Sequence, residues 1–279
     1  MTGDSVRPGG MGGPGGADGV AHSIAIASGK GGVGKSTVAV NLAVALGQTG
    51  AATGLLDADI YGPSIPMMTG VRRMPESNGQ RILPIVAHGV RMMSLGFLMP
   101  EGAPTVWRGP MVSGAIQQFL RDVEWGRLEY LLIDLPPGTG DAQLTLAQSI
   151  PLTGAVVVMT PQDVAWSIAS KAVAMFNQLK VPILGLIENM SGFVCPHCGA
   201  PSAVFRRGGA RGAGGHPGLP LLGEIPLDPV ICQTGDSGEP IPVTHPDSPV
   251  ADAFRRIASA LTGRIAEEVH SGPVIRVGP

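Results

Sequence analysis

The segment from Gly29 to Ser36, GKGGVGKS, constrains this chain most strongly, because it matches the phosphate-binding pattern G-x-x-x-x-G-K-[ST]. It stands between an apolar, strand-like run, IAIAS, and a helix-like run, STVAVNLAVAL. Glycines let successive backbone N–H groups converge on phosphate oxygens, and the start of a helix adds partial positive charge. A glycine-rich turn without a ligand is the alternative, which the Lys-Ser pair and the strand-to-helix placement disfavour. The pattern therefore predicts a nucleotide-binding P-loop.

The residues expected to hold the nucleotide follow from this pattern. In loops of this type the lysine, here Lys35, reaches the β- and γ-phosphates, and the hydroxyl of Ser36 ligates Mg²⁺. The guanine-reading sequence Asn-Lys-x-Asp does not occur in the chain, which favours ATP over GTP. The expected phosphate contacts are Gly29, Lys30, Gly31, Gly32, Val33, Gly34, Lys35, Ser36 and Thr37.

Short apolar runs alternate with helix-length segments along the body of the chain. Runs such as LLID, AVVVM and ILGLI are apolar on both faces, which is typical of parallel strands covered by helices on each side. This pattern predicts an α/β fold with a doubly wound, mostly parallel sheet of the P-loop NTPase class. The expected elements are residues 22–28, 34–48, 52–57, 90–95, 110–123, 130–134, 141–149, 155–160, 163–179, 183–188, 221–225 and 249–261.

Composition divides the chain into three parts. The first twenty residues contain eight glycines and two prolines, which predicts a flexible arm over residues 1–20. Residues 21–265 show no internal repeat and no change of composition, so we expect a single P-loop ATPase domain there. Residues 266–279 are expected to form a C-terminal tail.

Charge and hydropathy exclude several classes of protein. The net charge is -2 and no run of basic residues exceeds a pair, which argues against bulk attraction to nucleic acid or anionic lipid. The longest apolar stretches are far shorter than the roughly 18 residues that span a bilayer. The N-terminus lacks the plan of a signal peptide, and three cysteines cannot form a secreted disulfide framework. We therefore expect a cytoplasmic protein.

Carboxylates at the ends of two predicted strands complete the expected phosphoryl-transfer site. Asp57 and Asp59 alternate in LLDAD, so both are expected to point the same way at the sheet edge where such folds bind ligands. Asp134 ends the run LLID and a Pro-Pro-Gly loop follows, which indicates a Walker B carboxylate and places Gly138 near the γ-phosphate. A lone strand-end Asp is more often a cap or turn residue, but a preceding P-loop reverses that preference.

Cys195 and Cys198 form a C-x-x-C pair, which we expect in a loop directly after the strand-like run ILGLIENM. Two thiolates make half of a tetrahedral metal site, and two chains related by a two-fold axis would supply four. A zinc site completed by a histidine, a redox pair and unmetallated thiols remain alternatives. The histidines in question are His197, His216 and His245. Cys232, the third cysteine, is expected to be a small buried apolar residue.

Two resemblances follow from these motifs. With its second lysine, Lys30, the P-loop resembles the deviant Walker A motif K-G-G-x-G-K-[ST] of ATPases related to MinD, ParA and NifH, although a solvated lysine is the alternative. From about His22 to about Leu261, the chain also resembles the Mrp/ApbC/Nbp35 group of iron–sulfur cluster carrier ATPases. The segments that carry this second resemblance are SGKGGVGKST, LLDADIYGPSIP, VWRGPMVSGAIQQFL, IDLPPGTGDAQLTLAQ, TPQDVA, IENMSGFVCPHCG and LGEIPLDP.

The resemblance implies an ATP-hydrolysing homodimer that carries a labile [4Fe–4S] cluster and transfers it to apo-proteins. It implies that Cys195 and Cys198 of both subunits hold the cluster. It also implies that Lys30 contacts phosphates across the dimer interface, that Asp59 orients the attacking water, and that Asn189 lies at the adenine.

The chain departs from this group in three places. Only a glycine-rich arm stands where many bacterial members have a small N-terminal domain, and the extra N-terminal cysteine cluster of eukaryotic members is absent. Ile168 replaces a residue that is commonly acidic. This last departure puts the usual contacts of its helix in question.

Two other functions compete with cluster transfer: a MinD/ParA-like positioning switch, and a zinc-stapled regulatory ATPase. The C-terminal sequence RIAEEVHSGPVIRVGP contains two acids, two glycines and two prolines, unlike an amphipathic basic membrane anchor. A DNA-binding surface would need clustered basic residues, yet two of the four lysines belong to the P-loop. We therefore expect neither a membrane nor nucleic acid as partner.

Overall fold

The structure is a computed structural model that describes residues 18–59, 62–98, 109–195, 198, 200–202, 204 and 219–270. Most of the expected N-terminal arm lies outside the described residues, as do residues 271–279 of the expected tail. His197 and His216, two of the candidate zinc ligands, also lie outside them.

Strands and helices alternate in the described chain, as the sequence predicted. The strands are β1 (Val20–Ala27), β2 (Thr53–Asp57), β3 (Ile85–Ala87), β4 (Val90–Ser94), β5 (Leu128–Asp134), β6 (Gly154–Met159), β7 (Ile183–Val194), β8 (Pro201–Ser202) and β9 (Leu221–Leu227). The helices are α1 (Lys35–Gln48), α2 (Ile65–Met68), η1 (Leu95–Phe97), α3 (Gly109–Asp122), α4 (Asp141–Ser149), α5 (Asp163–Gln178), α7 (Pro229–Ser237), α8 (Ile241–Thr244) and α9 (Pro249–His270).

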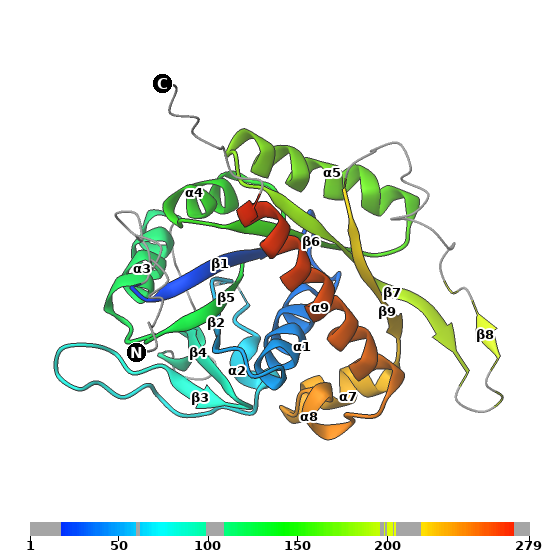
Figure 1. Ribbon diagram of the computed structural model, residues 1–279, viewed down its shortest axis with the longest axis horizontal. Helices are drawn as coiled ribbons and strands as arrows, with labels where there is room; N and C mark the ends of the chain where they lie inside the picture. Colours follow the sequence, from blue (N-terminus) through cyan, green and yellow to red (C-terminus); the bar gives the residue numbers. More distant parts are fainter. Residues whose placement is uncertain are drawn as a thin grey trace, which may run out of the picture.

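These strands form one twisted sheet in the order β3-β4-β2-β5-β1-β6-β7-β8, with β9 also paired to β7 (Figure 1). The pairs from β4 to β7 are parallel, whereas β3 and β8 run antiparallel to their neighbours. From β1 the chain goes to β2, on one side of β1. It later returns to β5, between β2 and β1, and continues to β6 on the other side of β1. This reversal confirms the doubly wound α/β class and makes the carboxyl ends of the central strands the expected ligand edge.

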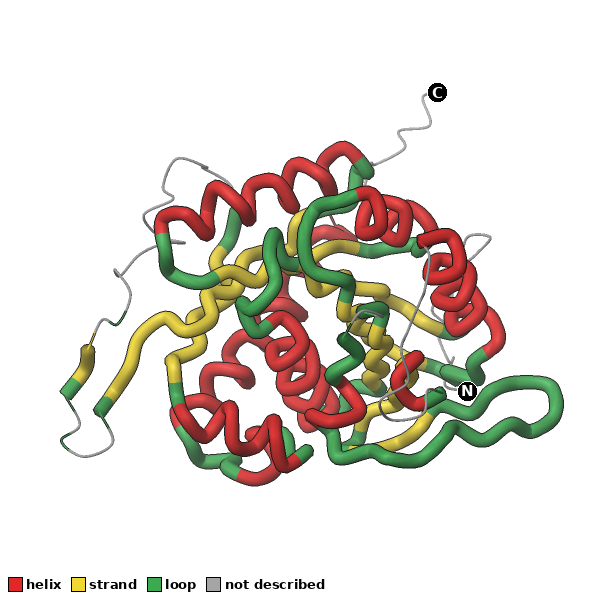
Figure 2. The backbone as a smooth tube through the Cα atoms, turned by 180° about the vertical axis from the view of Figure 1, so that it is seen from behind, coloured by secondary structure: helices red, strands yellow, loops and turns green. Residues whose placement is uncertain are grey.

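Helices cover both faces of the sheet. On one face α1 packs against α9, and on the other lie α3, α4 and α5 (Figures 1 and 2). The central strands are therefore buried on both sides: every residue of β6 and β2 is buried. Their apolar runs show no alternation because neither face meets water.

The last helix is longer than the sequence suggested. Buried residues recur every three or four positions along α9, at Val250, Phe254, Ile257, Leu261 and Ile265. This helical period continues past Leu261, where we expected the helix to end, and the helix extends to His270. The domain boundary expected at residue 265 thus falls inside α9.

Strand β7 also differs from expectation. We predicted a strand over residues 183–188 and a loop carrying the cysteines soon after it, but β7 continues to Val194. The extension, NMSGFV, mixes polar and apolar residues and is mostly half-buried, so it lacks the continuous apolar run that marked residues 183–188. It is held instead by pairing with β9 on one side and with β8 beyond it. Cys195 therefore follows directly on a strand.

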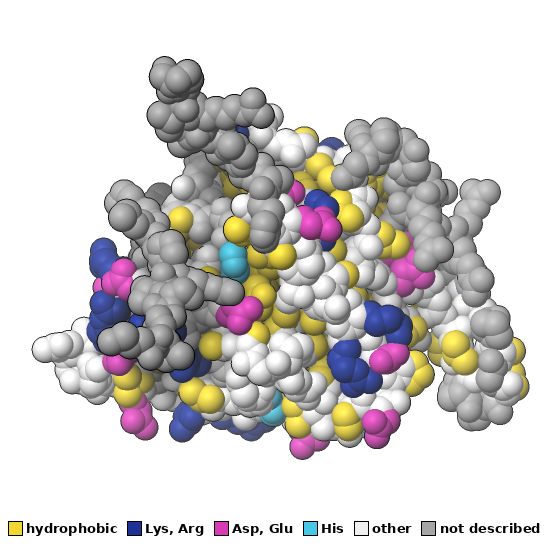
Figure 3. Space-filling model, viewed as in Figure 1, with side chains coloured by type: hydrophobic (Ala, Val, Ile, Leu, Met, Phe, Trp, Pro, Cys, Tyr) yellow, Lys and Arg dark blue, Asp and Glu magenta, His cyan; other side chains and the backbone are white. Residues whose placement is uncertain are grey.

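Basic side chains of the surface lie beside acidic ones on the face shown in Figure 3. On α9, for example, Asp252 pairs with both Arg255 and Arg256, and Arg264 pairs with Glu267. In the described part of the chain, no helix is long and apolar enough to cross a membrane.

Candidate functional site

The P-loop connects the end of β1 to the first residue of α1, at the carboxyl edge of the sheet. Gly32 and Gly34 have φ angles of 76° and 80°, in the left-handed region that glycine adopts without strain. Gly29 is required for a different reason, because an added Cβ would lie 2.3 Å from the carbonyl oxygen of Ile168. Helix α5 thus packs directly on the start of the loop, and Ile168 is part of that contact.

Lys35 and Ser36 converge on the carboxylate of Asp134. The ammonium group of Lys35 donates to Oδ1 at 2.6 Å, and the hydroxyl of Ser36 donates to Oδ2 at 2.5 Å. Asp134 is fully buried and Lys35 is only 6% exposed. Parallel pairing of β1 with β5 places the end of β5 beside the P-loop, which is why residues 98 and 99 positions apart meet. Asp134, which the sequence predicted as the Walker B carboxylate, thus lies against two side chains of the P-loop.

Asp57 and Asp59 occupy different environments. The carboxylate of Asp59 lies 3.8 Å from the Lys35 ammonium group. The carboxylate of Asp57 instead accepts hydrogen bonds from the Ser94 hydroxyl, at 2.9 Å, and from the Asp59 backbone N–H, at 3.1 Å. Ser94 ends β4 directly opposite Asp57 in the parallel register, a partner that sequence reasoning missed because it required the order of the strands.

Burial sets the protonation of the two strand-end carboxyls. It raises the pKa of Asp57 to about 8, with a further increase from the nearby Asp134. Burial also raises the pKa of Asp134, against the opposing effect of Lys35 and Ser36. Asp134 and Asp59 pair with the single ammonium group of Lys35, and the carboxyl of Asp57 is close enough to Asp134 to raise its own pKa further. Such a surplus of acidic groups favours an added cation.

This arrangement predicts a pH-dependent stability. Because the folded-state pKa of Asp57 lies above its unfolded value of 3.8, the folded protein binds the extra proton and its stability falls as pH rises from about 4 to about 8. One such proton lowers the free energy of unfolding by up to about 1.4 kcal/mol for each unit of increasing pH. Asp57→Asn should remove this slope, so urea unfolding between pH 5 and 8.5 should show the variant gaining stability relative to wild type as pH rises. Parallel pH profiles for the two proteins would contradict the assignment.

The loop that follows β5 and contains Gly138 lies against the P-loop. Gly138, with a φ of 103°, donates its backbone N–H to the carbonyl oxygen of Ser28 at 3.0 Å. The hydroxyl of Ser28 in turn donates to the carbonyl oxygen of Lys30 at 2.9 Å. Movement of this loop would therefore shift the backbone at Lys30, the extra lysine of the P-loop.

Lys30 itself is partly exposed at the tip of the P-loop. Among the described residues, no acid forms an ion pair with its ammonium group. This placement leaves the ammonium group able to reach a ligand or a second chain.

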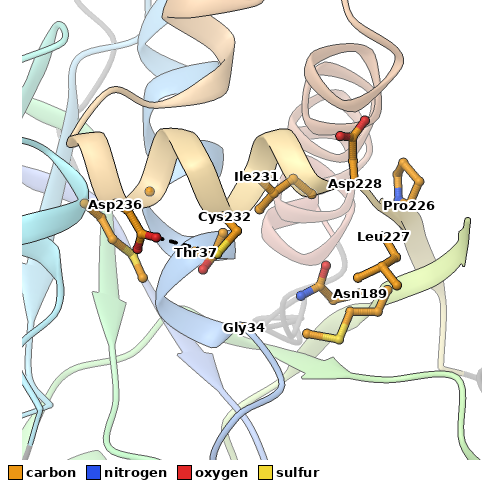
Figure 4. A pocket seen from close by; sticks show the side chains of 12 residues that line it. Gly34, Thr37, Asn189, Pro226, Leu227, Asp228, Ile231, Cys232 and Asp236 are labelled. Carbon is orange, nitrogen blue, oxygen red and sulfur yellow. Dashed lines mark hydrogen bonds between the residues drawn. The ribbon is translucent and has the colours of Figure 1, made fainter. Parts of the chain in front are cut away.

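A cavity of about 240 Å³ opens beside the P-loop (Figure 4). Asn189 lies at its floor, buried, and donates a hydrogen bond from its side-chain Nδ2 to the carbonyl oxygen of Val33 at 2.8 Å. The remaining lining is mainly apolar and comes from α1, α2, β7, β9 and α7. The lining residues are Gly34, Thr37, Met68, Asn189, Met190, Pro226, Leu227, Asp228, Ile231, Cys232, Gly235 and Asp236.

Cys232 is not the buried apolar residue that the sequence suggested. It is exposed on α7 and lines this cavity, with its Sγ 3.7 Å from a carboxylate oxygen of Asp236. Asp228 caps α7 by accepting a hydrogen bond from the backbone N–H of Val230. Side chains of the helix that begins there line the cavity. Sequence reasoning recognised the segment LGEIPLDP but did not assign it to a site.

The cysteine pair lies beyond the carboxyl end of β7, in the connection of a two-stranded hairpin with β8. Phe193 and Val194 of β7 pair with Ser202 and Pro201 of β8, and the hairpin extends away from the body of the molecule (Figure 1). Cys195 donates its backbone N–H to the carbonyl oxygen of Ala200 at 3.0 Å. Cys195 is partly exposed and Cys198 is exposed.

A complete metal site is not formed by the described part of one chain. Within it, no three His, Cys, Asp or Glu side chains gather closely enough to hold a metal ion. His245 lies at the end of α8, where its Nδ1 is 3.0 Å from the hydroxyl of Thr244, and it is not grouped with the cysteines. The hairpin thus offers one partly exposed and one exposed cysteine, and a metal bound by both would need further ligands from elsewhere.

Comparison with known proteins gives consistent results. The ParA family model described as NUBPL iron-transfer P-loop NTPase matches residues 19–262. The chain is 51% identical over 255 residues to an iron-sulfur cluster carrier protein of Aquifex aeolicus, covering 90% of this chain and 70% of that protein. It is 48% identical over 251 residues to the iron-sulfur cluster transfer protein NUBPL of Mus musculus, covering 89% and 79%.

Solved structures show the same fold. A nucleotide-binding protein of Archaeoglobus fulgidus, in complex with ADP, superposes with a TM-score of 0.70 at 40% identity, covering 79% of this chain and 88% of that one. The cell division ATPase MinD of Pyrococcus furiosus superposes with a TM-score of 0.66 at 22% identity, covering 87% and 98%. The MinD likeness extends to the fold alone.

Proposed function

This chain belongs to the family of NUBPL iron-transfer P-loop NTPases, and on that premise we propose that it is an ATP-hydrolysing carrier of a [4Fe–4S] cluster. In this proposal two copies hold one labile cluster between them and deliver it to apo-proteins. The names of its relatives support iron–sulfur cargo, and the geometry of the P-loop supports the nucleotide.

The observation that carries the nucleotide assignment is the continuity of the P-loop with the cavity. Gly34 and Thr37 belong to both, so phosphates on the loop and a base in the cavity would be parts of one ligand. The mainly apolar lining suits the faces of a purine, and buried Asn189 supplies a polar contact at its edge. We assign the phosphates to residues 29–37, with Lys35 as the principal cation.

The oxygen atoms beside Lys35 fit a magnesium ion. Ser36 offers a hydroxyl, Asp134 a carboxylate, and hard divalent cations prefer oxygen ligands. Mg²⁺, when bound with ATP, would neutralise charge on the phosphates during phosphoryl transfer. Within the chain, Lys35 orients the phosphates. The backbone N–H of Gly138 donates to Ser28, so it would have to leave that partner to reach the γ-phosphate. Lys30 acts across the dimer interface.

Asp59 is proposed to orient the attacking water. Its carboxylate is 13% exposed and lies 3.8 Å from Lys35, close to where the γ-phosphate would lie. Asp59→Asn keeps the shape of the side chain and removes its charge. We expect it to retain nucleotide affinity while turnover falls by about 10²- to 10⁴-fold, as when a group that handles a reacting proton is lost.

The measurement for Asp59 is steady-state ATP hydrolysis alongside calorimetric titration with Mg·ADP. Asp122→Asn, a surface carboxylate on α3, is the matched control and should leave both values unchanged. Full turnover in Asp59→Asn would remove Asp59 from the water-orienting role, whereas loss of binding would reassign it to the nucleotide site.

The cluster assignment rests on the number of thiols. One hairpin offers Cys195 and Cys198, and four thiolates are needed for a [4Fe–4S] cluster. Two hairpins brought together by a two-fold axis supply four thiolates, in two symmetry-related pairs. Exposure of the thiols suits a cluster that is passed on, because an acceptor can approach the sulfur atoms directly.

A further inference from the structure

One strand, β7, connects the cavity to the cysteine pair. Asn189 and Met190 line the cavity, and Cys195 follows the last residue of the same strand. Cys195 lies six positions after Asn189, at most about 20 Å of extended chain. Asn189 is anchored on the P-loop through its bond to Val33, so this segment is fixed at its nucleotide end.

Met190 has an unusual backbone within this segment. Its φ is 62°, and the other non-glycine residues with positive φ in the described chain are His88 and Lys180. His88 lies in the two-residue turn between β3 and β4, and Lys180 follows the end of α5, both places where left-handed residues are common. Met190 instead lies inside a strand, so its surroundings impose this conformation.

The ladder between β7 and β9 is interrupted at the same place. Asn189 pairs with Ile225, and the next pair is Phe193 with Leu227, so β7 uses four residues where β9 uses two. Within this bulge the hydroxyl of Ser191 donates to the carbonyl oxygen of Ile225 at 3.1 Å. Beyond it, β7 pairs with β8 and carries the cysteines. The bulge thus separates a part fixed to the P-loop from a part that forms the hairpin.

We propose that the β7 bulge centred on Met190 transmits occupancy of the nucleotide cavity to Cys195 and Cys198 within one chain. A base in the cavity would press on the Met190 side chain, and a change at its backbone would reorient the hairpin beyond it. The inference rests on the proposed function, because it takes the cavity ligand to be a nucleotide. It adds a route that does not pass through the dimer interface.

The thiols themselves report on this coupling. Cluster-free protein is treated with N-ethylmaleimide with and without Mg·ADP, and the alkylation rates at Cys195 and Cys198 are followed by peptide mass spectrometry, which separates them from Cys232. We expect the nucleotide to change these rates about fivefold or more, the lower end of typical coupling between sites. The change should be the same at low and high protein concentration.

Two glycine substitutions provide the matched comparison. Met190→Gly removes the side chain and frees the backbone, so the nucleotide effect on the rates should fall to within about twofold of none, below the range of real coupling. Lys180→Gly relieves the same backbone conformation far from the cavity and should keep the full effect. Retention of the full effect in Met190→Gly would overturn the proposal.

Mg·ADP binding and alkylation rates of the wild-type protein test the proposal even if Met190→Gly does not fold. Calorimetric binding of Mg·ADP without any change in alkylation rate would overturn the inference and leave the proposed function intact. A change that appears only at high protein concentration, or that Lys30→Ala abolishes, would place the coupling in the dimer and also overturn it. Absence of nucleotide binding in wild type would overturn both proposals together.

Discussion

Lys35→Ala should weaken nucleotide binding, with affinity for Mg·ADP falling by about 10- to 150-fold, since a charge-assisted contact contributes about 1.5–3 kcal/mol. The loss has two causes: the cation nearest the phosphates disappears, and the carboxylate of Asp134, 2.6 Å away, is left to repel them. Isothermal titration calorimetry measures the effect. Lys171→Ala, an exposed lysine on α5, is the matched control and should bind as wild type does.

A folding defect in Lys35→Ala can be separated from the loss of binding. Removing one partner of a buried ion pair destabilises a protein by about 3–5 kcal/mol, because the other charge stays buried. The double variant Lys35→Ala with Asp134→Asn removes that charge, so it should recover stability in urea without recovering affinity. Unchanged affinity in the folded Lys35→Ala protein would refute the P-loop assignment.

Cys195→Ala should abolish cluster binding, because a site of four thiolates would lose two of them at once when both chains carry the change. After anaerobic reconstitution, wild type should contain about four irons per dimer and the variant almost none. Cys232→Ala should keep the iron of wild type, since Cys232 lies at the cavity and not on the hairpin. Full iron content in Cys195→Ala, or reduced iron in Cys232→Ala, would contradict the assignment.

The parts of the site that sequence reasoning predicted are those fixed by local pattern. The P-loop, the strand that ends at Asp134 and the contact between them follow from a motif and from parallel pairing. Asn189 was placed through family resemblance, and it lies at the cavity beside Gly34.

The parts that sequence reasoning missed depend on tertiary pairing. Ser94 contacts Asp57 only because β4 lies next to β2. Strand β7 extends past Glu188 because β9 and β8 pair with a segment of mixed polarity. Cys232 was wrongly predicted to be buried for a similar reason. Its surroundings are set by the cavity that α7 borders, which its neighbours in sequence do not reveal.

The central claim, that two copies share one cluster through their cysteine hairpins, is tested most directly by native mass spectrometry of the anaerobically reconstituted protein. For wild type we expect a dimer whose mass exceeds that of two chains by one [4Fe–4S] cluster. For Cys195→Ala we expect either a dimer without the added mass or dissociated single chains. A single chain that carries its own cluster, or a chain that carries one zinc ion, would contradict it.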